Sequence, residues 1–255
     1  MKRIVLKVGS AVLTERSELA LERIDNLVEF IGELKNEYEV MLVSSGAVAA
    51  GYTELALDKS FLANKQALAS LGQPLLMKQY YKKLKAKGIL CSQILLTADD
   101  FDSRKRTEHA KNAVEVMLKN GIVPIINEND VTATEELVFG DNDRLSAHVC
   151  YYFDASMLVV LTDVDGYYDS NPRENPSAKM YKKRDKIDKN ELIVEHKQSS
   201  SFATGGIKTK LQAAQFLLEN GKKMFLTSGF DLSFAREYLI EGRHTKGTLF
   251  AKGLE

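Results

Sequence analysis

The sequence has no tryptophan, only four prolines, two cysteines and four histidines among its 255 residues. Cys91 and Cys150 have no further Cys or His at ligand spacing, so neither a zinc site nor a disulfide framework is expected. This cysteine usage fits a reducing, cytoplasmic setting. No linker rich in Pro or Ser divides the chain, so we expect a single domain over residues 1–255.

An excess of either charge and a long apolar run are also lacking. The 35 Lys and Arg residues balance 35 Asp and Glu residues, so nothing attracts the chain to nucleic acid or anionic lipid. No segment approaches the roughly 20 apolar residues of a membrane span, and the N-terminus lacks the apolar stretch of a signal peptide. The basic run 179–189 is interpreted as a solvated surface. We therefore expect a small-molecule partner, with no nucleic acid and no membrane.

The chain alternates short β-branched runs with longer segments of helical periodicity. This alternation is typical of a parallel sheet whose strands are joined by helical crossovers, so the predicted fold class is α/β. The predicted strands are Arg3–Val8, Val40–Val43, Ile89–Leu95, Ile122–Ile126, Met157–Thr162 and Met224–Thr227, with a short final strand at 246–250.

Three helical regions separate the first strands. Apolar residues from Leu21 to Leu34 recur every three or four positions, which predicts a helix that covers the sheet. A second region, 61–87, is expected to be interrupted at Gly72-Gln73-Pro74 and to end at Gly88. A third, 103–120, is expected to stop at Gly121.

Two segments of small and polar residues directly follow the first two strands. Lys7-Val8-Gly9-Ser10 offers an ammonium group and backbone N–H donors to a phosphate. Ser44–Gly51 allows a ligand to approach the backbone at a helix N-terminus, although tight packing of that helix on the sheet would explain its Ala and Gly residues equally well.

Acidic and amide residues gather after the strand at 122–126, in Asn127–Asp130 and in 140–143. Such a segment suits recognition of an ammonium group, while about half of these residues are expected to form turns and caps. Asp141 or Asn142 is a candidate N-cap for the helix that follows.

Two more polar segments follow later in the chain. The Asp-x-Asp-Gly sequence after Thr162 resembles the start of a calcium loop, but the later ligands and the closing Glu are absent. The turn 204–210 places hydroxyl, backbone N–H and ammonium donors at a helix N-terminus, which predicts a phosphate site. It is not a Walker A loop, and no Gly-x-Gly-x-x-Gly follows the first strand.

Lys7 and Lys210, with nearby carboxylates, together indicate phosphoryl transfer, which needs positioning and charge neutralisation rather than a covalent residue. His109 and His148 lie in predicted helices, and His196 and His244 lie in polar loops. None of the four histidines has a nucleophile beside it, so a hydrolase of the Ser/His or Cys/His type is not supported.

Seven of these motifs, in register, resemble the amino acid kinase family. They occur in the expected order from Met1 to about Phe250, and several motifs in order are far more specific than one alone. They read LKVGSAVLT, VSSGAVAAG, INENDVTA, FGDNDRLSA, LTDVDG, TGGIKTKLQAA and KGTLF.

The resemblance implies a three-layer αβα sandwich around an open, mostly parallel sheet of about eight strands. It also implies transfer of the ATP γ-phosphoryl group to the side-chain carboxylate of L-glutamate, the first step of proline biosynthesis. Mg²⁺ would arrive with ATP, held by phosphate oxygens and water, without a dedicated protein metal site. Feedback inhibition by proline and a homo-oligomeric state are further implications.

The resemblance assigns a role to each site residue. Lys7 and Lys210 would contact the phosphoryl oxygens as catalytic residues, with Asp143 holding them. Ser45, Asp130 and Asn142 match glutamate-binding positions, with Asp130 facing the substrate ammonium. The ATP-binding positions are Lys7, Thr162, Asp163, Thr204, Gly205, Gly206, Ile207, Lys208, Thr209 and Lys210.

The sequence leaves two alternatives open. A related kinase could act on N-acetylglutamate, aspartate or carbamate, but the acidic segments favour a free amine because an acetylated amine needs no acidic partner. A catalytically silent protein of the same fold would be expected to lose a lysine, and both are present. Many family members add a C-terminal domain of the PUA type, which resembles RNA-binding domains; we expect no such domain within residues 1–255.

Overall fold

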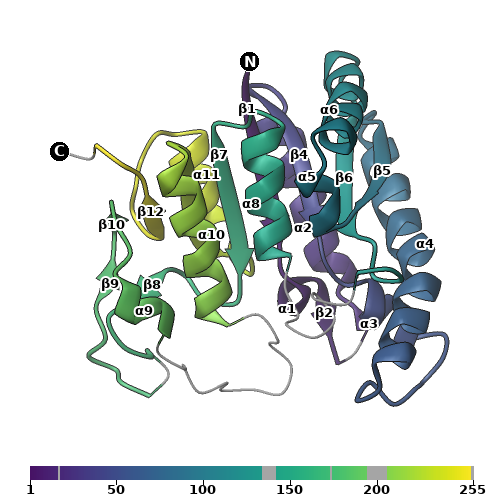
Figure 1. Ribbon diagram of the computed structural model, residues 1–255, viewed down its shortest axis with the longest axis horizontal. Coiled ribbons are helices and arrows are strands. Elements are labelled where there is room, and N and C mark those ends of the chain that lie inside the picture. The colour runs from purple at the N-terminus through teal and green to yellow at the C-terminus, as the bar shows by residue number, and fades with distance from the viewer. Residues whose placement is uncertain (17, 134–141, 173, 194–205, 254–255) are drawn as a thin grey trace.

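An eight-stranded sheet forms the centre of the protein, as the computed structural model shows (Figure 1). The structure describes residues 1–16, 18–133, 142–172, 174–193 and 206–253. The strands lie in the order β10-β12-β11-β7-β1-β4-β6-β5, and every neighbouring pair is parallel except β11 and β12. Their bounds are β1 Lys2–Val8, β4 Tyr38–Ser44, β5 Cys91–Leu96, β6 Val123–Glu128, β7 Met157–Thr162, β10 Lys183–Arg184, β11 Lys223–Ser228 and β12 Thr248–Phe250.

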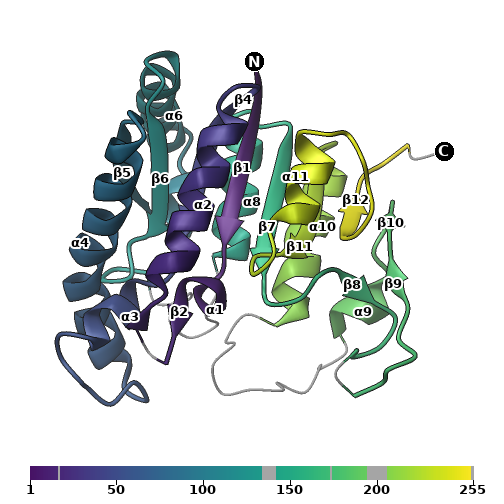
Figure 2. The same ribbon diagram turned by 180° about the vertical axis from the view of Figure 1, so that it is seen from behind.

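Helices cover both faces of this sheet. The helices α8 and α10 lie in front of it in Figure 1, and α2 and α11 lie in front of it in Figure 2, where the molecule is seen from behind. None of the described helices combines the length and the apolarity needed to cross a membrane. The helices are α1 Ser10–Leu13, α2 Leu21–Leu34, α3 Ala47–Tyr52, α4 Leu62–Ala86, α5 Ala98–Asp102, α6 Arg104–Lys119, α8 Asp143–Tyr152, α9 Lys189–Ile193, α10 Ile207–Glu219 and α11 Ser233–Leu239.

Two small antiparallel pairs of strands extend from the sandwich. One joins β2 (Thr14–Glu15) to β3 (Glu18–Leu19), and the other joins β8 (Tyr167–Tyr168) to β9 (Met180–Tyr181).

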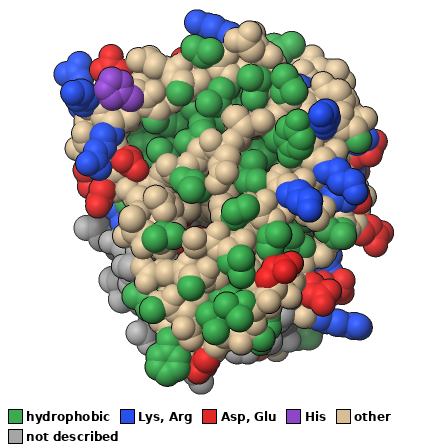
Figure 3. Space-filling view, turned by 90° about the vertical axis from the view of Figure 1, so that its right-hand side faces the viewer, with side chains coloured by type: hydrophobic (Ala, Val, Ile, Leu, Met, Phe, Trp, Pro, Cys, Tyr) green, Lys and Arg blue, Asp and Glu red, His purple; other side chains and the backbone are tan. Residues whose placement is uncertain are grey.

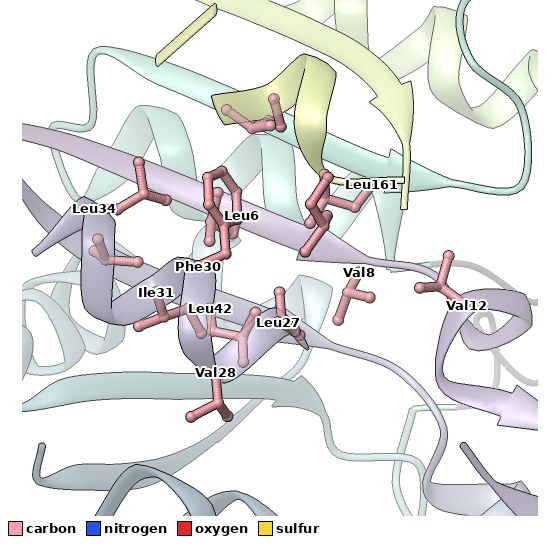
Figure 4. Close-up of a cluster of buried hydrophobic side chains, with 14 of the residues drawn as sticks. Leu6, Val8, Val12, Leu27, Val28, Phe30, Ile31, Leu34, Leu42 and Leu161 are labelled. Atoms are coloured by element: carbon pink, nitrogen blue, oxygen red, sulfur yellow. The ribbon is translucent and has the colours of Figure 1, made fainter. Parts of the chain in front are cut away.

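Strand side chains alternate between two hydrophobic cores, one on each face of the sheet. In β1, Ile4, Leu6 and Val8 enter the core beneath α2, whereas Val5 enters the core beneath α8 and α10. Figure 4 shows the first core, where Leu27, Ile31 and Leu34 of α2 pack against β1 and β4. This alternation is the two-residue period of a β-strand, and it makes the fold a three-layer αβα sandwich, as expected.

The six strands that the sequence predicts in its first 230 residues are all present, and their ends shift by at most two residues. The helices at 21–34 and 104–119 are also confirmed, and Gly88 and Gly121 follow helix ends with positive φ angles of 70°. The predicted interruption at Gly72-Gln73-Pro74 is wrong, because α4 runs without a break from Leu62 to Ala86.

Gly72 has a different role from a helix break: it lets α4 touch α3. A Cβ atom at Gly72 would lie 1.9 Å from the backbone oxygen of Ala47, and one at Gly51 would lie 1.9 Å from the backbone oxygen of Leu68. Only glycine permits two helices to pack this closely.

The parallel strands bring their carboxyl ends to one edge of the sheet. There, the N–H of Gly9 donates to Leu161 O at 3.0 Å, the N–H of Ser45 to Val8 O at 3.3 Å and the N–H of Gly229 to Thr162 O at 2.7 Å. The loops that follow β1, β4, β7 and β11 are therefore tied together. Open α/β sheets bind ligands at this edge.

Candidate active site

A buried carboxylate joins two lysines from distant parts of the chain. Asp143 Oδ1 lies 2.8 Å from Lys7 Nζ, and Asp143 Oδ2 lies 3.1 Å from Lys210 Nζ. The side chain of Asp143 is fully buried, and those of Lys7 and Lys210 are 1% and 6% exposed. Ionised groups are buried at this level only when they are paired, so the three charges form one unit.

The position of each residue of this trio follows from its element. Lys7 lies two residues after Val5 in β1, so the two side chains point to the same face of the sheet. This is the face that α8 and α10 cover. Asp143 is the first residue of α8 and Lys210 lies in the first turn of α10. A carboxylate is favoured at a helix N-terminus, where the unpaired N–H groups carry a partial positive charge.

Thr209 adds a neutral hydrogen bond to the trio. Its hydroxyl donates to Asp143 Oδ2 at 2.9 Å, and it also lies 2.9 Å from Gly206 O. The first turn of α10 thus contacts the carboxylate through both Thr209 and Lys210.

Asp130, Ser45 and Asn142, the predicted glutamate-binding residues, are all buried. Burial raises the pKa of the Asp130 carboxyl from its ordinary value of 3.8 to about 7. Asp130 Oδ1 and Asn142 Oδ1 find no hydrogen-bond partner among the described residues. Buried oxygens of this kind are candidate acceptors for a ligand's N–H groups.

Asn142, one of the two candidate caps of α8, uses its side chain elsewhere. It occupies the N-cap position of α8, but its side chain makes no capping hydrogen bond. Its Nδ2 instead donates to Ser44 O at 2.8 Å and to Asn127 Oδ1 at 2.7 Å, and lies 3.2 Å from Ser45 Oγ. The other candidate cap, Asp141, lies outside the described residues.

Four buried residues support Asn142, and two of them, Gln73 and Tyr80, were not expected to take part in the site. Asn127 Nδ2 donates to Gln73 Oε1 at 2.8 Å, and Tyr80 and Ser44 share a hydrogen bond of 2.8 Å. Gln73 and Tyr80 both belong to the buried face of α4. The signal that could have found them is a polar group on the apolar stripe of a helix.

The predicted nucleotide-binding residues are placed only in part. Thr162 ends β7, and its hydroxyl donates to Asp163 Oδ1 at 3.1 Å. Gly206 is the N-cap of α10, and Ile207, Lys208 and Thr209 are the first residues of that helix, at the same edge of the sheet. Thr204 and Gly205 lie outside the described residues.

Two histidines that the sequence predicts to lie in helices do so. His109 lies in α6 and His148 in α8, where desolvation lowers the pKa of His148 to about 4. No group of three or more His, Cys, Asp or Glu side chains in the described ranges could hold a metal ion.

Known proteins resemble this chain in both sequence and fold. Residues 2–228 match the amino acid kinase family. A protein named glutamate 5-kinase from Leishmania donovani is 57% identical, with 98% of this chain and 95% of that protein covered. Another of the same name from Wolinella succinogenes is 57% identical over the whole of both chains.

The fold has solved counterparts at low sequence identity. The crystal structure of UMP kinase from Ureaplasma parvum aligns with a TM-score of 0.66 at 19% identity, covering 98% of this chain and 99% of that one. An isopentenyl phosphate kinase aligns with the same TM-score at 16% identity, covering 98% and 100%. At such identities the likeness concerns the fold alone.

Proposed function

This chain belongs to the amino acid kinase family, and on that premise we propose that it transfers the γ-phosphoryl group of ATP to the side-chain carboxylate of L-glutamate. The product is L-glutamyl 5-phosphate, and the reaction is the first step of proline biosynthesis. Relatives named glutamate 5-kinase support this substrate. The observation that carries the proposal is the buried Lys7–Asp143–Lys210 unit at the ligand edge of the sheet.

Lys7 and Lys210 are proposed to contact the transferred phosphoryl group. Their ammonium groups come from β1 and α10, so a phosphate placed at this edge meets a positive charge from each side. In phosphoryl transfer, charge on the phosphoryl oxygens must be neutralised by groups that are already in place. Asp143 keeps both ammonium groups fixed before substrate arrives.

Asp130, Asn142 and Ser45 are proposed to bind glutamate. The carboxylate of Asp130 suits the substrate ammonium, and Asn142 Oδ1 is a second acceptor without a described partner. A carboxylate opposite the amine favours free glutamate over its N-acetylated form, because the acetylated amine carries no positive charge.

ATP is proposed to bind along the carboxyl ends of β7 and β11, with Thr162, Asp163 and the 204–210 turn as its contacts. A helix N-terminus such as that of α10 offers N–H donors to phosphate oxygens. No described cluster of acidic residues builds a separate metal site, so Mg²⁺ is proposed to enter bound to the phosphates and water. When bound, Mg²⁺ would neutralise negative charge on the phosphate oxygens.

A homo-oligomer is proposed through the side of the molecule formed by α4, β5 and α6. Figure 3 shows hydrophobic side chains gathered on this face. The exposed ones include Leu71 and Tyr81 of α4, Leu95 of the edge strand β5 and Val116 of α6. Exposed apolar groups beside an open strand edge suit a second copy of the same surface. Light scattering should therefore give a mass above that of one chain.

Three further properties are proposed from the family resemblance. Proline is proposed to inhibit by feedback, and the site of action is proposed to be the cytoplasm, in keeping with two free cysteines. Residues 1–255 are proposed to suffice as one catalytic domain.

A coupled assay of ADP release tests the substrate. Purified protein is supplied with ATP, Mg²⁺ and, side by side, glutamate, aspartate or N-acetylglutamate. We expect turnover with glutamate far above that with the other two. Equal or greater turnover with N-acetylglutamate or aspartate would reject glutamate as the substrate.

A further inference from the structure

The buried face of α4 carries two polar side chains that reach the ends of neighbouring strands. Gln73 and Tyr80 are seven residues apart, which is about two helical turns, so they lie on the same side of the helix. Gln73 is 8% exposed and Tyr80 is fully buried. Desolvating a hydroxyl and an amide is unfavourable unless both make specific hydrogen bonds.

Gln73 fixes which way the amide of Asn127 faces. Its Oε1 accepts from Asn127 Nδ2 at 2.8 Å, while Asn127 Oδ1 accepts from the N–H of Glu128 at 2.9 Å. With its N–H₂ group turned toward α4, Asn127 presents Oδ1 to Asn142, whose Nδ2 donates to it at 2.7 Å.

The orientation of Asn142 follows from these bonds. Its Nδ2 has two hydrogens, and both Asn127 Oδ1 and Ser44 O accept from this nitrogen at 2.7 and 2.8 Å. Its Oδ1 must then point away from both, and it has no hydrogen-bond partner among the described residues. A reversed amide would set two carbonyl oxygens against each other, so Oδ1 stays available to a ligand's donor.

Tyr80 helps to position Ser44 O, the second acceptor of the Asn142 amide. Its hydroxyl shares a hydrogen bond of 2.8 Å with Ser44 Oγ, and it is the donor when Ser44 Oγ donates to Ser45 O at 3.0 Å. These bonds hold the Ser44–Ser45 peptide, whose Ser44 O accepts from Asn142. The helix itself is held in place by the backbone contact of Gly72 with Ala47, just beyond Ser45.

We infer that Gln73 and Tyr80 are positioning residues for substrate recognition: from α4 they fix the Asn142 amide so that its Oδ1 accepts from the substrate amine. This inference rests on the proposed function for the identity of the substrate. The two residues act through Asn127 and Ser44 and touch neither ATP nor the lysines that face it.

The test compares Gln73→Met and Tyr80→Phe with matched controls on the same helix. Gln79→Met and Tyr81→Phe make the same chemical changes away from Asn127 and Ser44. Tyr81 is exposed, and its hydroxyl accepts a hydrogen bond from Lys85 on the same helix. Each variant is assayed for kcat and for the KM of glutamate and of ATP, and glutamate affinity is measured by calorimetry. Gln73→Glu restores an oxygen acceptor for Asn127 and serves as the rescue variant.

We expect Gln73→Met and Tyr80→Phe each to raise the glutamate KM by about 3- to 10-fold, the range of one net hydrogen bond, with the ATP KM unchanged. In the double variant, the glutamate KM should rise by less than the product of the two single increases, because both residues position the same Asn142 amide. Gln73→Glu should bind glutamate more tightly than Gln73→Met.

Three results would contradict the inference. If the wild type is active and each variant has the same glutamate KM as its control, the inference is wrong and the proposed function stands. Equal increases in the KM of ATP and glutamate would show a merely structural role. Wild-type protein without glutamate-dependent ADP release would overturn the proposed function itself, and the inference with it.

Discussion

Asp143 divides its two carboxylate oxygens between two lysines that lie more than 200 residues apart in the chain. Each lysine therefore has a fixed direction before any phosphate arrives. Fixed charges stabilise developing charge better than mobile ones, because no reorganisation is needed during the reaction.

Replacing either lysine should impair catalysis more than glutamate binding. Lys7→Ala and Lys210→Ala are each expected to lower kcat by on the order of 10²–10³-fold, because these cations meet charge on the transferring group. Lys223→Ala, at the exposed amino end of β11, is the control. Steady-state kinetics on variants with native circular dichroism provide the measurement, and a change confined to the glutamate KM would refute this role.

Asp130→Asn should weaken glutamate and leave ATP nearly unaffected. Loss of a charged hydrogen bond costs about 1.5–3 kcal/mol, which is roughly ten- to a hundredfold in affinity. Calorimetric titration with each ligand measures both affinities. Unchanged glutamate binding in the folded variant would show that Asp130 does not face the ammonium.

The same substitution should stabilise the ligand-free protein at high pH. Burial raises the pKa of Asp130 from 3.8 to about 7, so ionisation of this carboxyl opposes folding. The penalty is complete above pH 7 and disappears as the pH falls toward 4. We expect Asp130→Asn to melt at a higher temperature than the wild type at pH 8, with a smaller difference at pH 5. A constant difference across this range would contradict the pKa shift.

At the residue scale, the charged residues of the site could be predicted from the sequence, but the residues of α4 that position Asn142 were not predicted. Lys7 could be found because it lies near the end of the first strand, at the edge where a parallel sheet binds ligands, whereas the role of Asp143 came from the resemblance of its motif to the family. Polar groups on the apolar stripe of α4 could have marked Gln73 and Tyr80 as buried, but not their function, which depends on the strand ends that α4 packs against. That packing is a tertiary property which no local pattern reveals.

Helix α4 shows how an element can override a strong local signal. Gly72 and Pro74 predicted a break, yet the helix continues because Pro74 is exposed and the carbonyl left without a partner can reach water. The strands were predicted more accurately, because buried parallel strands are continuous apolar runs with clear ends.

The glycine contact between α3 and α4 should tolerate no side chain. Gly72→Ala places a Cβ against backbone atoms of Ala47 and Gly51, which cannot move aside as a flexible side chain can. We expect the free energy of unfolding to fall by about 2 kcal/mol or more. Gly32→Ala in α2 is the matched control, since its nearest neighbour atom would be 3.7 Å away.

Denaturation in urea measures both glycine variants. The control should gain up to about 1 kcal/mol, because alanine has a higher helix propensity than glycine. Equal stability of the two variants would contradict the packing argument.

On the scale of the whole molecule, we predict that residues 1–255 form an active kinase without another domain or protein. The seven motifs end at Phe250, where β12 pairs with β11. Protein supplied with ATP, Mg²⁺ and glutamate should form acyl phosphate, which hydroxylamine traps as the hydroxamate. A folded preparation that stays inactive until a partner is added would reject this prediction.

The order of strands has a consequence for synthesis of the chain. β1 is made first but lies between β4 and β7, and β7 begins only at Met157. On the ribosome, one edge of β1 therefore stays open while most of the first half of the protein is already available to fold. Open apolar strand edges recruit other chains, so this edge of β1 is a site for aggregation of the nascent protein until β7 emerges.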